Sequence, residues 1–110
     1  MKPEVRTFTR ENPCTKKDLW QCFRGPTGYR RVLVAVAYSQ IGVNAPRVME
    51  RQGYLVKNAT PQGDFLTLTE SGRQWLDKGI RAYVKNHPSE RDDIQYLDTE
   101  QPARRVTRRR

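Results

Sequence analysis

The stretch that decides the fold is NAPRVMERQGYLVKNATPQGDFLTLTESGRQW, residues 44–75. A short helical pattern comes first and is ended by Gly53, because glycine readily adopts the left-handed conformation found just past helix ends. Two β-favouring segments follow, 54–58 and 65–68, separated by a polar run of about six residues rich in turn formers. Thr69 then offers a side-chain cap for another helix. The stretch predicts a helix, a β-hairpin with a long loop, and a second helix.

The first helix of this stretch is short and carries arginines on one side. Asn44 is a good N-cap residue, and Pro46 falls in the first turn, where no intrahelical N–H is needed. We expect the helix to run from Ala45 to Gln52, with Arg47 and Arg51 projecting together because they lie four residues apart. The side that we expect to be buried consists of Val48, Met49 and Gln52.

Two further helices are predicted upstream. Thr15 provides an N-cap with Asp18 three residues later, and Gly25-Pro26 stops the helix that they begin. The run 29–41 is ambiguous, because its valines alternate as in a strand while its apolar residues also follow helical spacing. Its length exceeds that of a usual strand and favours a buried helix. The strand stays open as the alternative.

The last predicted helix, over 70–87, is long and amphipathic. Pro88 ends it. Its apolar residues recur on one face, at Leu76, Ile80, Tyr83 and Val84. This stripe needs cover, either from the domain or from a second copy of the chain. A homodimer through the 70–87 helix is therefore one expectation.

A chain of 110 residues has room for one domain with a modest core. We expect an N-terminal arm over 1–14, the domain over 15–87 and a flexible charged tail over 88–110. Within that tail, residues 89–102 carry five acids and one arginine. The same segment holds a small apolar group that offers a docking patch for a protein partner: Ile94, Tyr96 and Leu97.

The net charge of +9 is unevenly distributed along the chain. Residues 1–88 contain 15 Lys and Arg against 7 Asp and Glu, so the part expected to fold is itself basic. Residues 103–110 add five arginines. A positive field of this kind attracts polyanions, although many proteins are basic only for solubility. RNA binding through the arginine tail is a weaker alternative, because no platform for stacking single-stranded bases is evident.

Several classes of function lack the residues they need. Cys14, Cys22 and His87 are too few for a structural zinc site, which takes four ligands. Ser71 and His87 have no plausible triad arrangement, and there is no Gly-rich phosphate loop. We therefore expect no catalytic residues, no metal and no cofactor. No apolar run approaches the ~20 residues needed to cross a bilayer. Met1 is followed by Lys2-Pro3-Glu4 and no apolar h-region, so we expect no secretory signal. We expect a cytoplasmic protein without a membrane partner.

The predicted order of elements resembles the winged helix-turn-helix superfamily of DNA-binding domains over residues 15–87. One match is the turn 37–43, AYSQIGV, followed five residues later by the aliphatic Val48. The other is Gly53-Tyr-Leu-Val with FLTLTESGR at 65–73, which is similar to the wing of many bacterial and phage regulators. The resemblance implies an α+β, mainly α fold with a two-stranded wing and a long C-terminal helix. It also implies a small transcriptional regulator acting in a bacterial cell or an infected host.

Double-stranded DNA is the partner that this resemblance implies. A major groove accepts one α-helix, whose N-terminal residues face the base edges, so we expect Asn44, Arg47 and Arg51 to probe it. The residues expected to hold phosphates are Arg30, Arg31, Lys57, Asn58, Thr60 and Gln62. The alternatives are a solvated helix face with an ion pair to Glu50, and an ordinary polar hairpin loop.

The sequence departs from the family pattern in two places, and the second departure favours a rival function together with the acidic segment 89–102 and its apolar patch. Tyr38 occupies a position usually held by alanine, and the wing lacks the arginine that many DNA-reading wings insert into the minor groove. Winged helices are also used to bind proteins. The rival is a protein-interaction adaptor of phage type that acts on a host factor such as RNA polymerase, with residues 89–102 as a further contact.

Overall fold

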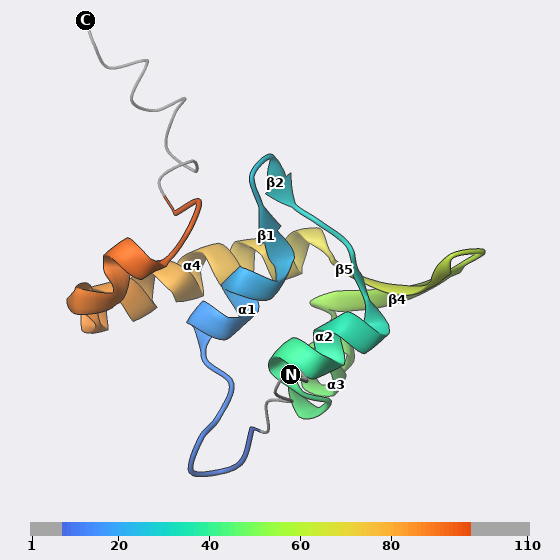
Figure 1. Cartoon of the computed structure of the whole chain (residues 1–110), viewed down its shortest axis with the longest axis horizontal. Coiled ribbons are helices and arrows are strands. Elements are labelled where there is room, and N and C mark those ends of the chain that lie inside the picture. The colour runs from blue at the N-terminus through green and yellow to red at the C-terminus, as the bar shows by residue number, and fades with distance from the viewer. Residues whose placement is uncertain (1–7, 98–110) are drawn as a thin grey trace, which may run out of the picture.

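The computed structural model describes residues 8–97 (Figure 1). In chain order the elements are α1 (Lys16–Phe23), β1 (Arg24–Gly25), β2 (Gly28–Tyr29), β3 (Val32–Leu33), α2 (Val34–Ile41), α3 (Asn44–Arg51), β4 (Leu55–Thr60), β5 (Gly63–Leu68), α4 (Glu70–Asn86) and the 3-10 helix η1 (Pro88–Asp93). The fold is α+β with helix predominating, as the sequence predicts.

The strands form two small antiparallel sheets. β1 pairs with β2, and the larger sheet has the order β3-β5-β4. Val32 pairs with Leu66, so a strand from before α2 and α3 closes onto the hairpin that comes after them. The β4–β5 hairpin extends away from the helices, at the opposite end of the molecule from η1 (Figure 1).

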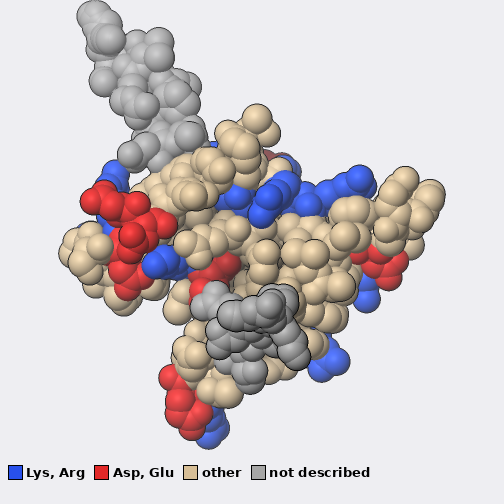
Figure 2. Space-filling model, viewed as in Figure 1, with Lys and Arg blue, Asp and Glu red and all other residues tan. Residues whose placement is uncertain are grey.

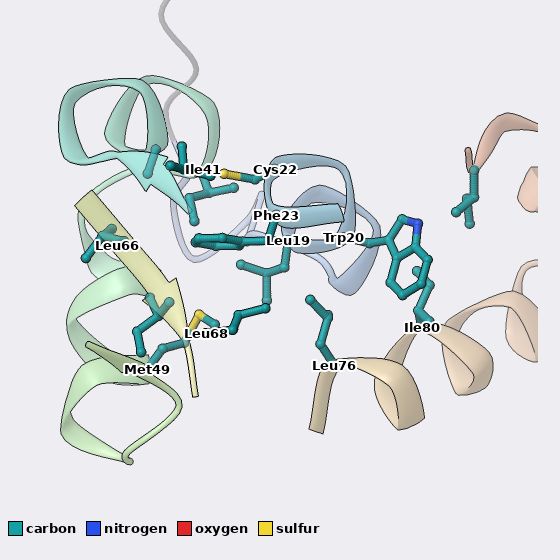
Figure 3. Packing of buried hydrophobic residues seen from close by; sticks show 14 of the residues in the cluster. Leu19, Trp20, Cys22, Phe23, Ile41, Met49, Leu66, Leu68, Leu76 and Ile80 are labelled. Atoms are coloured by element: carbon teal, nitrogen blue, oxygen red, sulfur yellow. The ribbon is translucent and has the colours of Figure 1, made fainter. Parts of the chain in front are cut away.

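The core lies between this sheet and the helices. Figure 3 shows side chains of α1 at its centre, with Leu66 and Met49 on one side and Leu76 on the other. Leu76, Phe23 and Trp20 are each no more than 1% exposed. The α4 stripe of Leu76, Ile80 and Val84 is buried within the chain itself. The apolar stripe of α4 is therefore buried against the rest of the domain, which is one of the two possibilities that the sequence left open.

The predicted N-caps of the first and last helices, Thr15 and Thr69, are confirmed. The Asp18 amide donates to Thr15 Oγ1 at 3.2 Å, and the Thr15 amide donates to Asp18 Oδ2 at 2.9 Å, which makes a complete capping box. Thr69 Oγ1 accepts from the Gly72 amide at 3.0 Å and donates to the Gly53 carbonyl at 2.7 Å. Gly53 itself has φ +81°, the left-handed conformation expected past the end of α3.

The prediction of one buried helix over 29–41 is wrong in its first part. Residues up to Leu33 belong to β2, β3 and their connection, and α2 begins only at Val34. Of the alternating residues that suggested a strand, only Val32 lies in one, and the helical spacing holds from Val34 onwards. Val32 and Leu33 pair with β5, and the chain becomes helical at the next residue, Val34. Of α2, Ala37 and Ile41 are buried, whereas Val36 is 40% exposed.

The hairpin loop is shorter than predicted. Its strands run to Thr60 and from Gly63, so Pro61 and Gln62 form a two-residue turn instead of a six-residue loop. The hydroxyl of Thr60 donates to the Gly63 carbonyl at 2.7 Å and accepts from the Gln62 amide at 3.1 Å. Backbone pairing extends through polar residues because both faces are accessible to water at this end of the sheet.

The start and rotation of α3 also differ from the prediction. Val43 is the N-cap residue, without a side-chain cap, and Asn44 is already helical. The buried residues are Pro46 and Met49, while Val48 is 44% exposed. Val48 is therefore not the buried aliphatic residue that the helix-turn-helix pattern predicts. α3 has only eight residues and contacts β4, so few of its side chains are buried.

The segment after α4 packs against the domain as far as the structure describes it. Ile94 is 5% exposed, and the Trp20 Nε1–H donates to the Gln95 carbonyl at 2.8 Å. Lys17 forms an ion pair with Glu90 at 3.2 Å. The prediction of a flexible tail from residue 88 is therefore wrong for residues 88–97, which pack on the domain. Because Ile94 is buried, it is not available as part of the expected docking patch. The remaining tail, 98–110, lies outside the described residues, as do residues 1–7 of the expected N-terminal arm. No helix of the described part is long and apolar enough to span a membrane.

Candidate nucleic-acid interface

The outward face of α3 carries the three residues expected to probe a groove. Asn44, Arg47 and Arg51 are all exposed, whereas Pro46 and Met49 on the opposite side are buried. The buried pair holds the helix against the domain, so the other side must face solvent. The structure therefore brings Asn44, Arg47 and Arg51 together on one accessible surface.

The alternative that Glu50 neutralises these arginines is wrong. Within residues 8–97 no ion pair links Glu50 to Arg47 or Arg51. Two guanidinium groups on the outward face of α3 thus keep their donors for another partner. Arginine suits guanine edges and phosphates because its forked donors match paired acceptor oxygens and nitrogens.

The hairpin candidates divide between the two faces of the sheet. Side chains alternate along a strand, and paired residues share a face. Lys57 pairs with the buried Leu66, so it belongs to the face that packs on the helices. Asn58 pairs with Phe65, and Thr60 with Gly63, so both belong to the other face.

The hairpin candidates also differ in what their polar groups already bind. Thr60 uses its hydroxyl within the turn, so it is the weakest candidate for a phosphate contact. Gln62 is exposed at the tip. Asp64 pairs with Ala59 and so shares the face of Lys57, where it adds one negative charge. That face therefore has mixed charge.

Arg30 and Arg31 do not begin a helix, contrary to the prediction, but lie in the connection between β2 and β3. Arg30 Nε and Nη2 each donate to the Cys22 carbonyl at 3.3 Å, near the C-terminal end of α1. The negative end of that helix dipole favours the guanidinium there. Arg31 lies over the Phe65 ring, 4.0 Å from its centroid. Arg31 thus stands on the same sheet face as Asn58, and Arg30 acts mainly within the fold.

The surface charge is divided along the molecule. Figure 2 shows a band of Lys and Arg atoms over the connection between β2 and β3, and a group of Asp and Glu atoms around η1 at the other end. The acidic end supplies Glu90, whose pKa is lowered by hydrogen bonds from Tyr83 and Lys17. On this face of the molecule, a polyanion would be repelled from the acidic group around η1 and attracted to the basic band.

Neither cysteine supplies a reactive centre on this surface. Cys14 and Cys22 are not joined in a disulfide, and burial raises the pKa of the Cys22 thiol to about 12. In the part of the chain that the structure describes, no three His, Cys, Asp or Glu side chains come together as a metal site would require. One basic residue that the sequence did not single out is Arg24. It is 7% exposed, donates to the Gly25 carbonyl and lies over the Trp20 ring, so its role is structural.

Comparison with protein-family models finds no match for this chain, and comparison with curated proteins finds none either.

Proposed function

We propose that this protein is a winged helix-turn-helix that binds double-stranded DNA and acts as a small transcriptional regulator of bacterial or phage type. One observation carries the proposal. The outward face of α3 presents Arg47 and Arg51 exposed and, among the described residues, without an acidic partner. The order of elements supports it, since α2 and α3 are followed at once by the β4–β5 hairpin in the place of a wing.

The dimensions of α3 suit a major groove. An α-helix with its side chains is about 10–12 Å across, comparable with the groove width of about 12 Å. Asn44 lies in the first turn, where recognition helices approach base edges most closely. Arg47 and Arg51 follow on the same side, so bases and the adjoining phosphates are within reach of a single helix face.

Phosphate contacts are assigned to a smaller set than the sequence suggested. Lys57 lies on the helix-facing side of the hairpin and Gln62 lies at its tip, so both flank a duplex held by α3. Arg31 and Asn58 lie on the other face of the sheet. They would contact phosphates only if the duplex bends around the hairpin or the contact extends over both faces. Arg30 and Thr60 contribute least, because their polar groups are bound within the fold.

Duplex binding at several salt concentrations tests the proposal. We compare wild type, the double variant Arg47→Ala/Arg51→Ala, a chain ending at Asp98, and the matched control Arg81→Ala/Lys85→Ala. The control removes two exposed cations four residues apart on α4. Each lost phosphate contact flattens the slope of log affinity against log salt by roughly 0.9. We expect the α3 variant to lose up to about two such contacts and the α4 control to lose none.

A different result would assign binding elsewhere. If only the chain ending at Asp98 loses affinity, then the arginine tail binds the duplex and α3 is not a reader. If the α4 control weakens binding as much as the α3 variant, then charge alone governs binding.

Protein binding is the second candidate function, and the outer face of the sheet favours it. Leu33 is 38% exposed and Val56 is 44% exposed, on the face that also carries Phe65. Exposed apolar groups of this kind mark contact sites for proteins when they adjoin one another. The double variant Leu33→Ser/Val56→Thr would then lose binding to purified bacterial RNA polymerase while keeping duplex affinity.

A further inference from the structure

A cavity of about 470 Å³ opens beside α3, on the side away from the hairpin. Its walls come from the segment before α1, from α1 itself, from α3 and from α4. Apolar side chains make up most of the lining, including Leu19, Met49 and Trp75. Small-molecule sites typically measure about 300–1,000 Å³ and have such a lining, so the cavity has the size of a ligand site.

The charged residues that line this cavity are both cations, Arg10 and Lys16. No carboxylate lines it among the described residues. The Lys16 ammonium lies 4.4 Å from the centroid of the Trp75 ring, and its aliphatic stem passes close over Gly79. No ion pair engages Lys16 within residues 8–97. A positive charge is thus held at an apolar cavity by the packing of its own stem.

We propose that this cavity binds a small amphipathic anion, with an apolar body and one carboxylate or sulfonate group. The apolar body would be removed from water by Leu19, Met49 and their neighbours, which is the main source of affinity in such sites. The anionic group would pair with Lys16, and Arg10 would attract it to the mouth. Binding of the ligand does not depend on the proposed DNA contact.

The cavity shares residues with the outward face of α3. Asn44 and Val48 line it, and Asn44 is also a proposed groove contact. A ligand seated there would occupy space beside the N-terminal turn of α3. It would therefore lower affinity for a duplex. This second part of the inference rests on the proposed function.

A fluorescent pair of probes tests the ligand class directly. Anilinonaphthalene sulfonate has an apolar aromatic body and one sulfonate, and phenyl-naphthylamine is nearly the same body without the charge. We expect both probes to bind the full-length protein. Ala45→Phe fills the cavity and should weaken both probes roughly tenfold or more, whereas the exposed Ala82→Phe should leave both unchanged.

The role of the charge is tested with Lys16→Met, which keeps the stem but removes the ammonium. It should weaken binding of the sulfonate by about fivefold and leave the uncharged probe unaffected. Lys85→Met, an exposed residue that does not line the cavity, is the matched control. Equal weakening of both probes by Lys16→Met would overturn the assignment of an anionic ligand.

The site can also be tested on the wild-type protein, so that the result does not depend on whether a variant folds. Cys14 lines the cavity, and Cys22 is buried with a pKa raised to about 12, so iodoacetamide should alkylate Cys14 selectively. Saturating sulfonate probe should slow that alkylation roughly fivefold or more. Unchanged alkylation, or equal probe binding by Ala45→Phe and Ala82→Phe, would overturn the site.

The coupling to DNA is tested last, by duplex affinity with and without the sulfonate probe. We expect the probe to weaken duplex binding by wild type and not by Ala45→Phe. If the probe binds and duplex affinity is unchanged, the coupling is overturned and the ligand site stands. If no duplex binds at all, the proposed function fails while the probe titration still decides the site.

Discussion

The two ends of the molecule use their polar residues differently. Around α1, α4 and η1, charged and hydroxyl groups bind one another, as in the Lys17–Glu90 ion pair and the Tyr83 hydroxyl that donates to Glu90 at 2.7 Å. Around α3, the polar groups of Arg47 and Arg51 stay exposed and have no acidic partner in the described structure. The first end stabilises the fold, and the second leaves its charges available for a partner.

The sharpest way to break this comparison is to remove one apolar side chain from each end. Leu76 on α4 is fully buried, so Leu76→Ala should lower the free energy of unfolding by about 2–5 kcal/mol. Val48 on α3 is 44% exposed, so Val48→Ala should change it by less than about 0.5 kcal/mol. Denaturant unfolding measures both. Similar losses would show that the two ends are equally packed.

A smaller effect is expected from glycines of α4. A Cβ added at Gly72 would lie 2.1 Å from the Tyr54 carbonyl oxygen, a backbone atom that also accepts from the Thr69 amide. Gly72→Ala should therefore cost about 1–3 kcal/mol by overpacking where α4 meets the base of the hairpin. At Gly79 the nearest atoms belong to the flexible Lys16 side chain. Gly79→Ala should cost little, since alanine favours helix by about 1 kcal/mol. Thermal unfolding of the pair tests this contrast.

On the exposed end, the charge balance of the hairpin should set affinity for DNA. Asp64 shares a sheet face with Lys57, so Asp64→Asn should raise duplex affinity by about twofold at low salt through reduced repulsion. Asp92→Asn removes one acid from η1 at the other end and should have no such effect. Fluorescence anisotropy with a labelled duplex measures both. An equal gain from the two variants would mean that only net charge matters.

The smallest expected effect is a change in the pH dependence of stability. Hydrogen bonds from Tyr83 and then Lys17 lower the pKa of Glu90, so the folded state binds its proton less readily than the unfolded state. The stability that Glu90 contributes is present above the ordinary carboxyl pKa of 4.5 and is lost as the pH falls through the lower folded pKa. Glu90→Gln should flatten that acid-side loss, whereas Asp92→Asn should retain it. Unfolding midpoints measured from neutral pH down to acid provide the comparison.

The same contact has an opposite consequence at high pH. The Glu90 hydrogen bond raises the pKa of Tyr83 above its ordinary value of 10, because it favours the protonated hydroxyl. The contribution of Tyr83 is present below that value and is lost as the pH rises through the higher folded pKa. In Glu90→Gln the titration of Tyr83, followed by its ultraviolet absorbance, should move to lower pH.

Prediction from sequence succeeded where a signal depends on neighbours along the chain. The Thr15 and Thr69 caps, the end of α3 at Gly53 and the extent of α4 were all recognised, because each depends on residues within about four positions. The exposure of Arg47 and Arg51 also followed from helical spacing. The interaction of Arg30 with Cys22 had no such signal, because it joins two elements.

The sequence alone predicted α1 and α4 with their Thr15 and Thr69 caps, the existence of the hairpin and the basic character of the chain, since local propensity and charge require no partner. Only the tertiary structure decided that Val32 pairs with Leu66, that Ile94 turns inward and that a cavity opens beside α3. These outcomes depend on contacts between residues far apart in the chain. Each such contact must offset the entropy lost on ordering both segments, so the surfaces that are present when the chain folds determine which contacts form.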